Sequence, residues 1–264
     1  PDVTPERDGK RLIVQPNTFN MYCHREPRFY LTVVWNGQWF KWENRNTNFL
    51  YGQPDGGPTH DAPQNGYLNR SRVSLDYIPR DNNHPYRPAI IFRMAEAYLS
   101  YAEALNESSE RMSHKQEILD NLNKIRHRAG IAEYGTGTDE NGFTRIKINF
   151  SDQKEVRRLI HKERRVEFVG EGVRYHDLRR WKTAHYGIGN LNEQGENPDW
   201  GVNGPDYGMN YYGTEYTDQG DNAFFKRTKY MDRVYPRKFY WYPIHQSEID
   251  KDPTLVQGPF WLGE

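Results

Sequence analysis

Aromatic and β-branched residues run on both sides of Asn36-Gly37 in the stretch RFYLTVVWNGQWFKW. An Asn-Gly pair between two such runs is a strong signal of a two-residue hairpin turn, and a turn of that length fixes the register of its strands. Trp35 would then oppose Gln38 on the buried face, and Trp39 would fall on the more polar face. The pattern therefore predicts a small β-hairpin near residues 28–42 with an exposed Trp39 ring.

Helical spacing of apolar residues begins after Pro88. Two successive stripes recur every three or four positions, one formed by Ile91, Met94, Ala95, Tyr98, Ala102 and Leu105 and the next by Ile118, Leu122, Ile125 and Ala129. Gly130 follows the second stripe as an αL cap would. The two stripes predict a helical hairpin of the tetratricopeptide type, although one pair does not make a periodic array.

A third helix is expected to begin near Ser151, where Glu155 follows in the first turn. The Gly170-Glu171-Gly172 break then separates it from a short helix that carries Leu178 and Trp181. After a long excursion, the tail FYWYPIHQSEIDKDP predicts a strand-like run, a proline turn and a short helix.

Two regions are rich in Gly, Pro, Asn and Asp, residues 51–88 and residues 185–229. The chain is accordingly expected to divide into a loop-rich segment, 1–88, and a helical region, 89–264. Loops as long as the second one are uncommon without a function. It carries Trp200, Tyr211 and Tyr212, which are second-rank candidates for ligand contact, although this loop would equally suit a cap on the fold or a partner contact.

The composition narrows the function classes. The 36 basic residues balance the 36 acidic ones, so no net field draws in nucleic acid or an anionic membrane. Aromatic residues reach 14%, with 19 Tyr and 7 Trp, and rings with a polar edge favour recognition surfaces. The single cysteine, Cys23, allows no internal disulfide, and no apolar run approaches the length of a membrane span.

Catalytic and metal chemistry find little support in the motifs. HExxH, CxxC, P-loop and GxSxG patterns are absent from the sequence, and nothing selects a pair of carboxylates for glycoside hydrolysis. Acidic loops at 55–61 and 218–222 offer oxygen ligands for calcium, but solvated turns explain them more simply. We therefore predict no catalytic residues, no metal and no cofactor, and an enzyme is the last of the alternatives.

Four blocks in register resemble the C-terminal region of the SusD/RagB-like family. They are REPRFYLTVVWNG (25–37), FRMAEAYLSYAEALNE (92–107) with LDNLNKIRHRAGI (119–131), IHKERRVEFVGEGVRYHDLRRWK (160–182) and YWYPIHQSEIDKDPTLVQGPFW (240–261). Two features depart from the family pattern: His245 stands where a second proline is common, and the tail reads Gln-Gly-Pro-Phe-Trp in place of Gln-Asn-Pro-Gly and an aromatic.

The resemblance implies a mainly α fold with tetratricopeptide-like hairpins and long loops. It further implies a nutrient-binding protein on the extracellular face of the outer membrane that captures an oligosaccharide for a SusC-like TonB-dependent transporter. Family members are about twice this length, so the chain is expected to be the C-terminal portion, with the lipid anchor on the missing half. A peptide-binding member and a helical-repeat interaction protein without a small ligand remain the alternatives.

The stretch from 151 to 182 interleaves ten Lys/Arg with six Asp/Glu residues. Pairing is the simplest account, because buried arginine–carboxylate networks position helices through bidentate bonds. We predict a structural network made of Glu163, Arg164, Arg165, Glu167, Arg174, Asp177 and Arg180.

For the ligand, exposed rings on loops are the best candidates, since a sugar can stack on them while planar polar groups bond its hydroxyls. Trp39 leads these candidates. Tyr51, Asn44 and Arg45 follow, because they lie just beyond the predicted hairpin.

Overall fold

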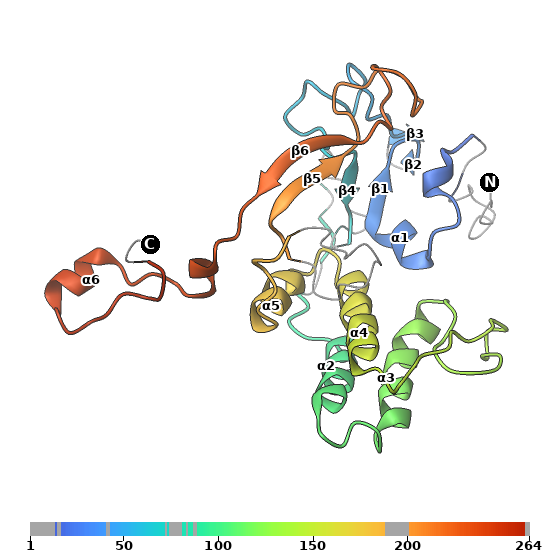
Figure 1. The fold of residues 1–264 in the computed structure, drawn as a ribbon. Coiled ribbons are helices and arrows are strands. Elements are labelled where there is room, and N and C mark those ends of the chain that lie inside the picture. The colour runs from blue at the N-terminus through green and yellow to red at the C-terminus, as the bar shows by residue number, and fades with distance from the viewer. Residues whose placement is uncertain are drawn as a thin grey trace. The chain divides into compact units, whose positions relative to one another are not determined.

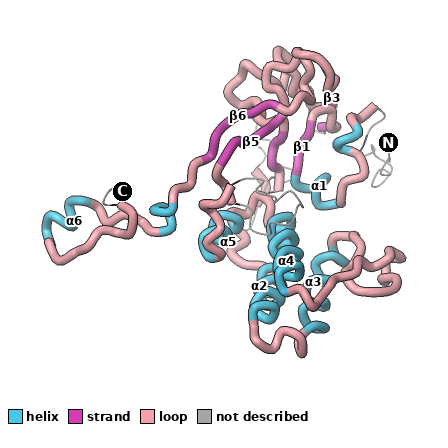
Figure 2. Tube along the Cα trace, viewed as in Figure 1, coloured by secondary structure: helices cyan, strands magenta, loops and turns pink. Residues whose placement is uncertain are grey.

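The computed structural model describes residues 14, 17–40, 43–71, 73, 81–82, 84–86, 89–187 and 201–261. Its longest helices fall between residues 94 and 167, and loops with short strands make up much of the remainder (Figure 2). The chain forms two compact units, Pro1–Gly172 with Tyr207–Tyr230, and Val173–Asp206 with Met231–Glu264. These units do not coincide with the division expected at residue 88.

Three helices of the first unit, α2 (Met94–Glu107), α3 (Lys115–Arg128) and α4 (Gln153–Glu167), pack against one another (Figure 1). Their shared core consists of fully buried aliphatic side chains: Leu99, Ile118, Leu122, Val156 and Ile160. The predicted helical hairpin is confirmed. Two members of the first stripe are exceptions: Ile91 precedes α2 and is 96% exposed, and Met94, the first residue of α2, is 58% exposed.

Local capping sets the ends of these helices. Gly130 ends α3 with a φ of 67°, a conformation that glycine adopts without a Cβ penalty. The N-cap of α4 is Asp152, one residue after the expected Ser151, and its carboxylate accepts from the backbone N–H groups of Lys154 and Glu155. The glycine break after α4 is confirmed, since Gly170 and Gly172 both have positive φ.

The N-terminal segment differs from the prediction. Residues 27–32 form a short helix, α1 (Pro27–Thr32), which places proline in the first turn, where its missing N–H costs nothing. The turn at Asn36-Gly37 is present and closes with a bond from the Gln38 N–H to the Trp35 carbonyl (3.2 Å). The strands it joins, β1 (Val33–Trp35) and β2 (Trp39–Phe40), do not pair with each other.

Each of these strands has another partner. β1 pairs with β4 (Tyr67–Asn69), and β2 pairs with β3 (Arg45–Asn46), so that Trp39 opposes Asn46. Thr47 explains the difference, because it occupies the hydrogen-bonding groups that a 28–42 hairpin would need. Its hydroxyl donates to the Trp35 carbonyl (2.7 Å), and its backbone exchanges bonds with Gly37 and Gln38.

An aromatic core fills the space behind these short strands. The short 3-10 helix η2 (Asn20–Tyr22) contributes Tyr22, whose ring lies near that of Trp35. Phe49 and Phe224 join this cluster from two loops far apart in the sequence. Trp35 is fully buried, as predicted.

The second unit contains α5 (Val173–Arg180), a 3-10 helix η5 (Arg237–Tyr240) and α6 (Gln246–Lys251). A small core of Leu178, Ala184 and Tyr235 supports it. The strand-like run expected in the tail was wrong, since η5 occupies its start, whereas the short helix after it is confirmed. The long excursion also holds two strands that the pattern did not predict, β5 (Gly204–Gly208) and β6 (Thr228–Arg233).

Candidate ligand-binding site

Three tyrosines meet on the loops of the first unit. The ring centroids of Tyr51 and Tyr211 are 6.1 Å apart, those of Tyr51 and Tyr212 5.6 Å, and those of Tyr211 and Tyr212 5.1 Å. Tyr51 and Tyr211 are half-buried, and Tyr212 is 70% exposed. We call these three residues the tyrosine cluster; it presents ring surface to solvent from two segments 160 residues apart.

Backbone hydrogen bonds hold the two loops together beneath the rings. The Tyr51 N–H donates to the Gly213 carbonyl (2.8 Å), and the Asn210 N–H donates to the Phe224 carbonyl (2.9 Å). Phe224 is anchored in the aromatic core, at 1% exposure. The cluster is therefore carried on loops that are tied to a buried scaffold, an arrangement that limits the entropy lost on binding.

Glycine permits the close approach of these loops. A Cβ at Gly213 would lie 2.4 Å from the Phe224 Cα, and a Cβ at Gly57 would lie 2.6 Å from the Tyr211 ring. Gly57 thus leaves the space that the Tyr211 ring occupies. The Tyr211 hydroxyl reaches the Thr59 carbonyl at 3.5 Å on the same side.

Two exposed polar residues lie close to Tyr51 in the sequence. Gln53, two residues after Tyr51, is exposed. Its Oε1 accepts a hydrogen bond from the Asn48 side-chain amide (3.3 Å). Thr59 is also exposed. Rings for the apolar face of a sugar and planar amides for its hydroxyls are the ingredients of a carbohydrate site.

A separate groove of about 920 Å³ lies along α3 and the connection 131–150. A cation lies over one face of each of its aromatic rings: Lys124 lies 4.5 Å from the Tyr98 ring centroid, Lys115 5.2 Å from that of Phe150, and Arg126 4.1 Å from that of Tyr134. These ring faces are not free for stacking, so the tyrosine cluster is the better candidate for sugar recognition.

Two of the four ligand residues predicted from the sequence, Trp39 and Arg45, lie on the paired strands β2 and β3, and Asn44 directly precedes β3. Tyr51 lies in the tyrosine cluster. Trp39 is half-buried on β2 rather than fully exposed, and Asn44 is exposed with a left-handed backbone, φ 49°. Trp200, a second-rank candidate, lies outside the described residues.

Arg45 is engaged by an ion pair. Its guanidinium donates to both oxygens of Asp55, at 2.6 and 2.8 Å. Burial opposes ionisation of Asp55, but the bonds from Arg45 and from the Asn48 N–H outweigh it, and the pKa of this carboxyl is lowered. Arg45 therefore fixes the loop after Tyr51, whether or not it also contacts a ligand.

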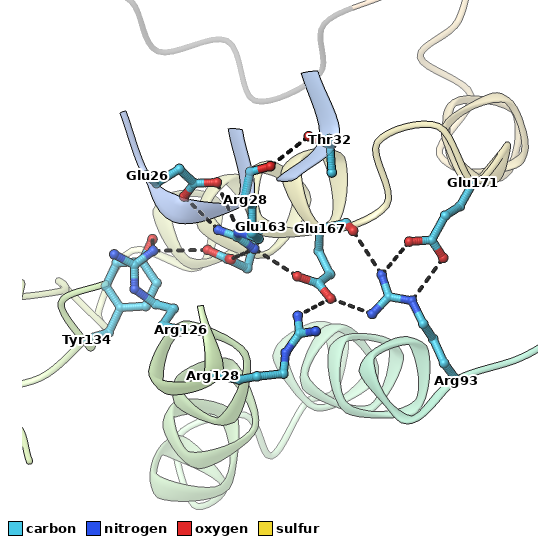
Figure 3. Close-up of polar contacts among 10 residues, drawn as sticks. All are labelled: Glu26, Arg28, Thr32, Arg93, Arg126, Arg128, Tyr134, Glu163, Glu167 and Glu171. Atoms are coloured by element: carbon cyan, nitrogen blue, oxygen red, sulfur yellow. Dashed lines mark hydrogen bonds and ion pairs between the residues drawn. The ribbon is translucent and has the colours of Figure 1, made fainter. Parts of the chain in front are cut away.

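A second constellation of charged residues lies among the helices of the first unit (Figure 3). Glu163, at 3% exposure, accepts from Arg28 (2.7 Å) and Arg126 (3.0 Å). Glu167 accepts from Arg28, Arg93 and Arg128. We call the whole set the arginine–glutamate network; its members are Glu26, Arg28, Arg93, Arg126, Arg128, Glu163, Glu167 and Glu171.

This network connects four segments of the chain. Arg28 comes from α1, Arg93 precedes α2, Arg126 and Arg128 end α3, and both central glutamates lie on α4. Arg93 also donates to Glu171 with two nitrogens, at 2.6 and 2.9 Å, and its guanidinium lies over the Phe168 ring. Four arginines match four glutamates, so the buried charges compensate one another.

Burial raises the pKa of Glu167, but the hydrogen bonds from Arg93 and Arg28 overcome that effect, and the net shift is downward. For Arg28, burial acts to lower the pKa, and its bonds to Glu26 and Glu163 raise it to a net upward shift. Both side chains are thus held in their charged forms. This is the behaviour of a structural network rather than of an acid–base catalyst, whose pKa is tuned toward neutrality.

The central glutamates of α4 bind arginines that lie outside α4. Their arginine partners come from α1, α3 and the segment before α2. Arg164 donates to Ser100 (3.0 Å) and lies 3.9 Å from the Glu103 carboxylate, both on α2. Arg165 is exposed. The reason is geometric, because α4 is packed on several sides and its buried carboxylates face other elements.

In the second unit, α5 carries charged side chains that interact over short sequence distances. Arg180 donates to Asp177 at 2.9 Å, and the guanidinium groups of Arg174 and Arg180 lie 5.9 and 4.9 Å from the Trp181 ring centroid.

Comparison with known proteins matches nearly the whole chain. The model of the SusD family aligns with residues 6–261. The chain belongs to the SusD family. Curated SusD relatives include the SusD-like proteins P25 and P38 of Formosa agariphila, each 32% identical, over 109 and 103 residues that make up 41% and 39% of this chain.

Solved SusD-like structures share the fold. A SusD-like protein (BF3747) of Bacteroides fragilis superposes with a TM-score of 0.63 at 26% identity over 92% of this chain, and a protein named BT4246 gives 0.62 at 25% over 90%. The chain covers 40% and 36% of those two structures, and the matched segments cover 18% and 19% of the curated relatives. The mainly helical, loop-rich fold expected from the resemblance is confirmed.

Within the described ranges, no helix of this SusD family member has the length and apolarity to cross a bilayer. The same ranges contain no group of three or more His, Cys, Asp or Glu side chains arranged to hold a metal ion.

Sequence reasoning placed Tyr211 and Tyr212 only in second rank and missed Arg28, Arg93, Arg126 and Arg128. A signal for the tyrosines existed in the paired rings of MNYYGT, next to a glycine in a long loop. No local sequence signal marks the four arginines, because they lie up to 139 residues from the glutamates they bind.

Proposed function

We propose that this SusD family chain takes part in the capture of an oligosaccharide at the cell surface, with the tyrosine cluster as the stacking surface. The observation that carries the proposal is the meeting of Tyr51, Tyr211 and Tyr212, with ring centroids within 6.1 Å of one another and one ring 70% exposed. Solvent-exposed aromatic clusters on anchored loops mark binding sites.

Binding rather than catalysis is the activity proposed. The buried acids Glu163 and Glu167 are each ion-paired with arginines. Because the pKa of Glu167 is lowered, its carboxylate is deprotonated at neutral pH and cannot serve as a proton donor. Release of reducing ends from a polysaccharide would contradict this part of the proposal.

The family further supports a place for the protein on the extracellular face of the outer membrane, where it would pass the glycan to a SusC-like TonB-dependent transporter. Co-purification with such a transporter from detergent extracts tests the partner separately from the ligand.

Calorimetric titration tests the glycan site. The chain is titrated with α-glucan, β-glucan, xylan and mannan oligosaccharides and with a peptide mixture, alongside Tyr212→Ala and the control Tyr86→Ala. Tyr86 is 90% exposed and makes no ring contact with the cluster in the structure. We expect heat with a glycan class, a loss of affinity of about tenfold in Tyr212→Ala, and no change in Tyr86→Ala.

Heat with peptides alone would favour the peptide-binding alternative. If neither glycans nor peptides give heat of binding, and the transporter co-purifies with the protein, an interaction protein without a small ligand would be favoured.

A further inference from the structure

The loops that carry the tyrosine cluster are unusually acidic for a chain without net charge. Residues 48–66 and 209–226 contain five carboxylates, Asp55, Asp61, Glu215, Asp218 and Asp221, against a single lysine, Lys226. The chain as a whole balances 36 basic with 36 acidic residues, so the excess is local.

Ion pairs engage the cations in and beside these loops. Lys226 binds Asp221 (2.8 Å) and Arg45 binds Asp55 (2.6 Å), while the guanidinium of Arg227 lies over the Tyr207 ring at 4.0 Å. Two of the remaining acids stand beside the rings in the chain. Asp61 follows two residues after Thr59, which accepts from the Tyr211 hydroxyl, and Glu215 follows three residues after Tyr212.

Both carboxylates are exposed, and both lie within three residues of a cluster tyrosine or of its hydrogen-bond partner in the chain. The Asp61 side chain is 88% exposed and lies 3.3 Å from the imidazole of His60, and Glu215 is exposed. Two or three residues of chain span at most about 11 Å between Cα atoms, well inside the screening length of about 30 Å at 0.01 M salt, although beyond the length of about 8 Å at physiological salt. A ligand stacked on the tyrosines therefore lies in a negative field.

We infer that the tyrosine cluster selects uncharged oligosaccharides and rejects anionic ones such as uronate-rich or sulfated glycans. The inference rests on the proposed glycan-binding function and adds the class of glycan. A neutral sugar loses no binding free energy in this field, because stacking on a ring and hydrogen bonds to hydroxyls need no charge on the ligand. Each carboxylate or sulfate on the ligand meets like charge, and the structure provides no unengaged Lys or Arg within the described parts of these two loops to offset it.

The test compares one sugar backbone in two charge states. The neutral oligosaccharide that binds in the panel is titrated beside its C6-oxidised derivative, in which primary alcohols have become carboxylates, at low and at high salt. We expect the oxidised form to bind roughly fivefold or more weakly at low salt, with a difference that narrows as salt is added.

Matched variants locate the effect. Asp61→Asn with Glu215→Gln removes two charges beside the cluster, while Asp120→Asn with Glu110→Gln removes two exposed charges on or beside α3. The first pair of substitutions should narrow the difference in affinity between the neutral and the oxidised sugar. The second pair should leave this difference in affinity unchanged.

Equal or tighter binding of the oxidised sugar would overturn the inference and leave the proposed function standing, as would an identical response of both variant pairs. Absence of binding by every neutral glycan would overturn both. Heat only with basic peptides would replace the glycan with a cationic ligand at the same acidic site.

Discussion

The tyrosine cluster and the arginine–glutamate network are both assembled from distant segments of the first unit, yet they differ in how they are held. In the network, charged side chains hold one another in the interior, and losing one partner strands a buried charge. In the cluster, the backbone and the aromatic core hold the loops, and the rings at the surface carry little of the fold. Under the proposed function, stability and recognition are therefore carried by separate side chains, so that each can be removed while the other is measured.

The largest expected effect is on stability, in the variant Glu163→Ala. It leaves Arg126, at 8% exposure, without the carboxylate that it binds, and should lower the free energy of unfolding by about 3–5 kcal/mol. Denaturant unfolding measures the loss, with Glu110→Ala as the control because its side chain is 78% exposed. Unchanged stability together with altered glycan affinity would break the comparison by giving the network a binding role.

The second effect concerns pH. The folded-state pKa of Glu167 is lowered, so its contribution to stability is present above the ordinary glutamate pKa of about 4.3 and is lost as the pH falls through the folded value. The contribution of Glu167 to stability should therefore stay nearly level from neutral pH to about pH 5 and fall in more acidic solution. Glu167→Gln should be less stable at neutral pH and should lose less on acidification; an equally steep acid loss in this variant would assign the effect to other groups.

A smaller effect is expected at Gly57, where a methyl group meets the Tyr211 ring. Gly57→Ala should displace that ring and weaken glycan binding by about threefold to tenfold, or about 1 kcal/mol, with little loss of stability because a side chain rather than backbone gives way. Gly258→Ala in the second unit is the control, since the Cβ there meets nothing closer than 3.3 Å. Similar affinities in the two variants would show that the Tyr211 position does not matter.

The smallest effect separates two roles of Arg45. Its ion pair with Asp55 is partly exposed, so Arg45→Ala and Asp55→Ala should each lower the free energy of unfolding by about 0.5–1 kcal/mol. If Arg45 acts only through Asp55, both variants should change glycan affinity by the same factor. A loss of affinity in Arg45→Ala alone would give Arg45 the direct ligand contact that the sequence predicts.

The contrast also separates what the sequence could predict from what it could not. The helical hairpin was predictable because local signals agree: apolar residues at helical spacing on α3 and a glycine at its C-terminal cap. The Asn-Gly turn was predictable too, but its strand partners were not, because Thr47 competes for the same hydrogen-bonding groups.

Long-range pairs explain the rest of the difference. The buried glutamates of α4 were recognisable as network residues, whereas their arginines lie on elements whose packing the pattern does not give. Tyr51 was predicted as a ligand residue from its position after the turn, but its meeting with Tyr211 and Tyr212 depends on a loop contact that no local spacing encodes.

The most direct test of the central claim is a crystal structure of the protein with the oligosaccharide that binds it best. The account predicts a sugar ring stacked on Tyr212, with Tyr51 or Tyr211 in contact with the same ligand and the arginine–glutamate network unchanged. A sugar bound in the groove along α3, or against Trp39 with the tyrosine cluster empty, would contradict it.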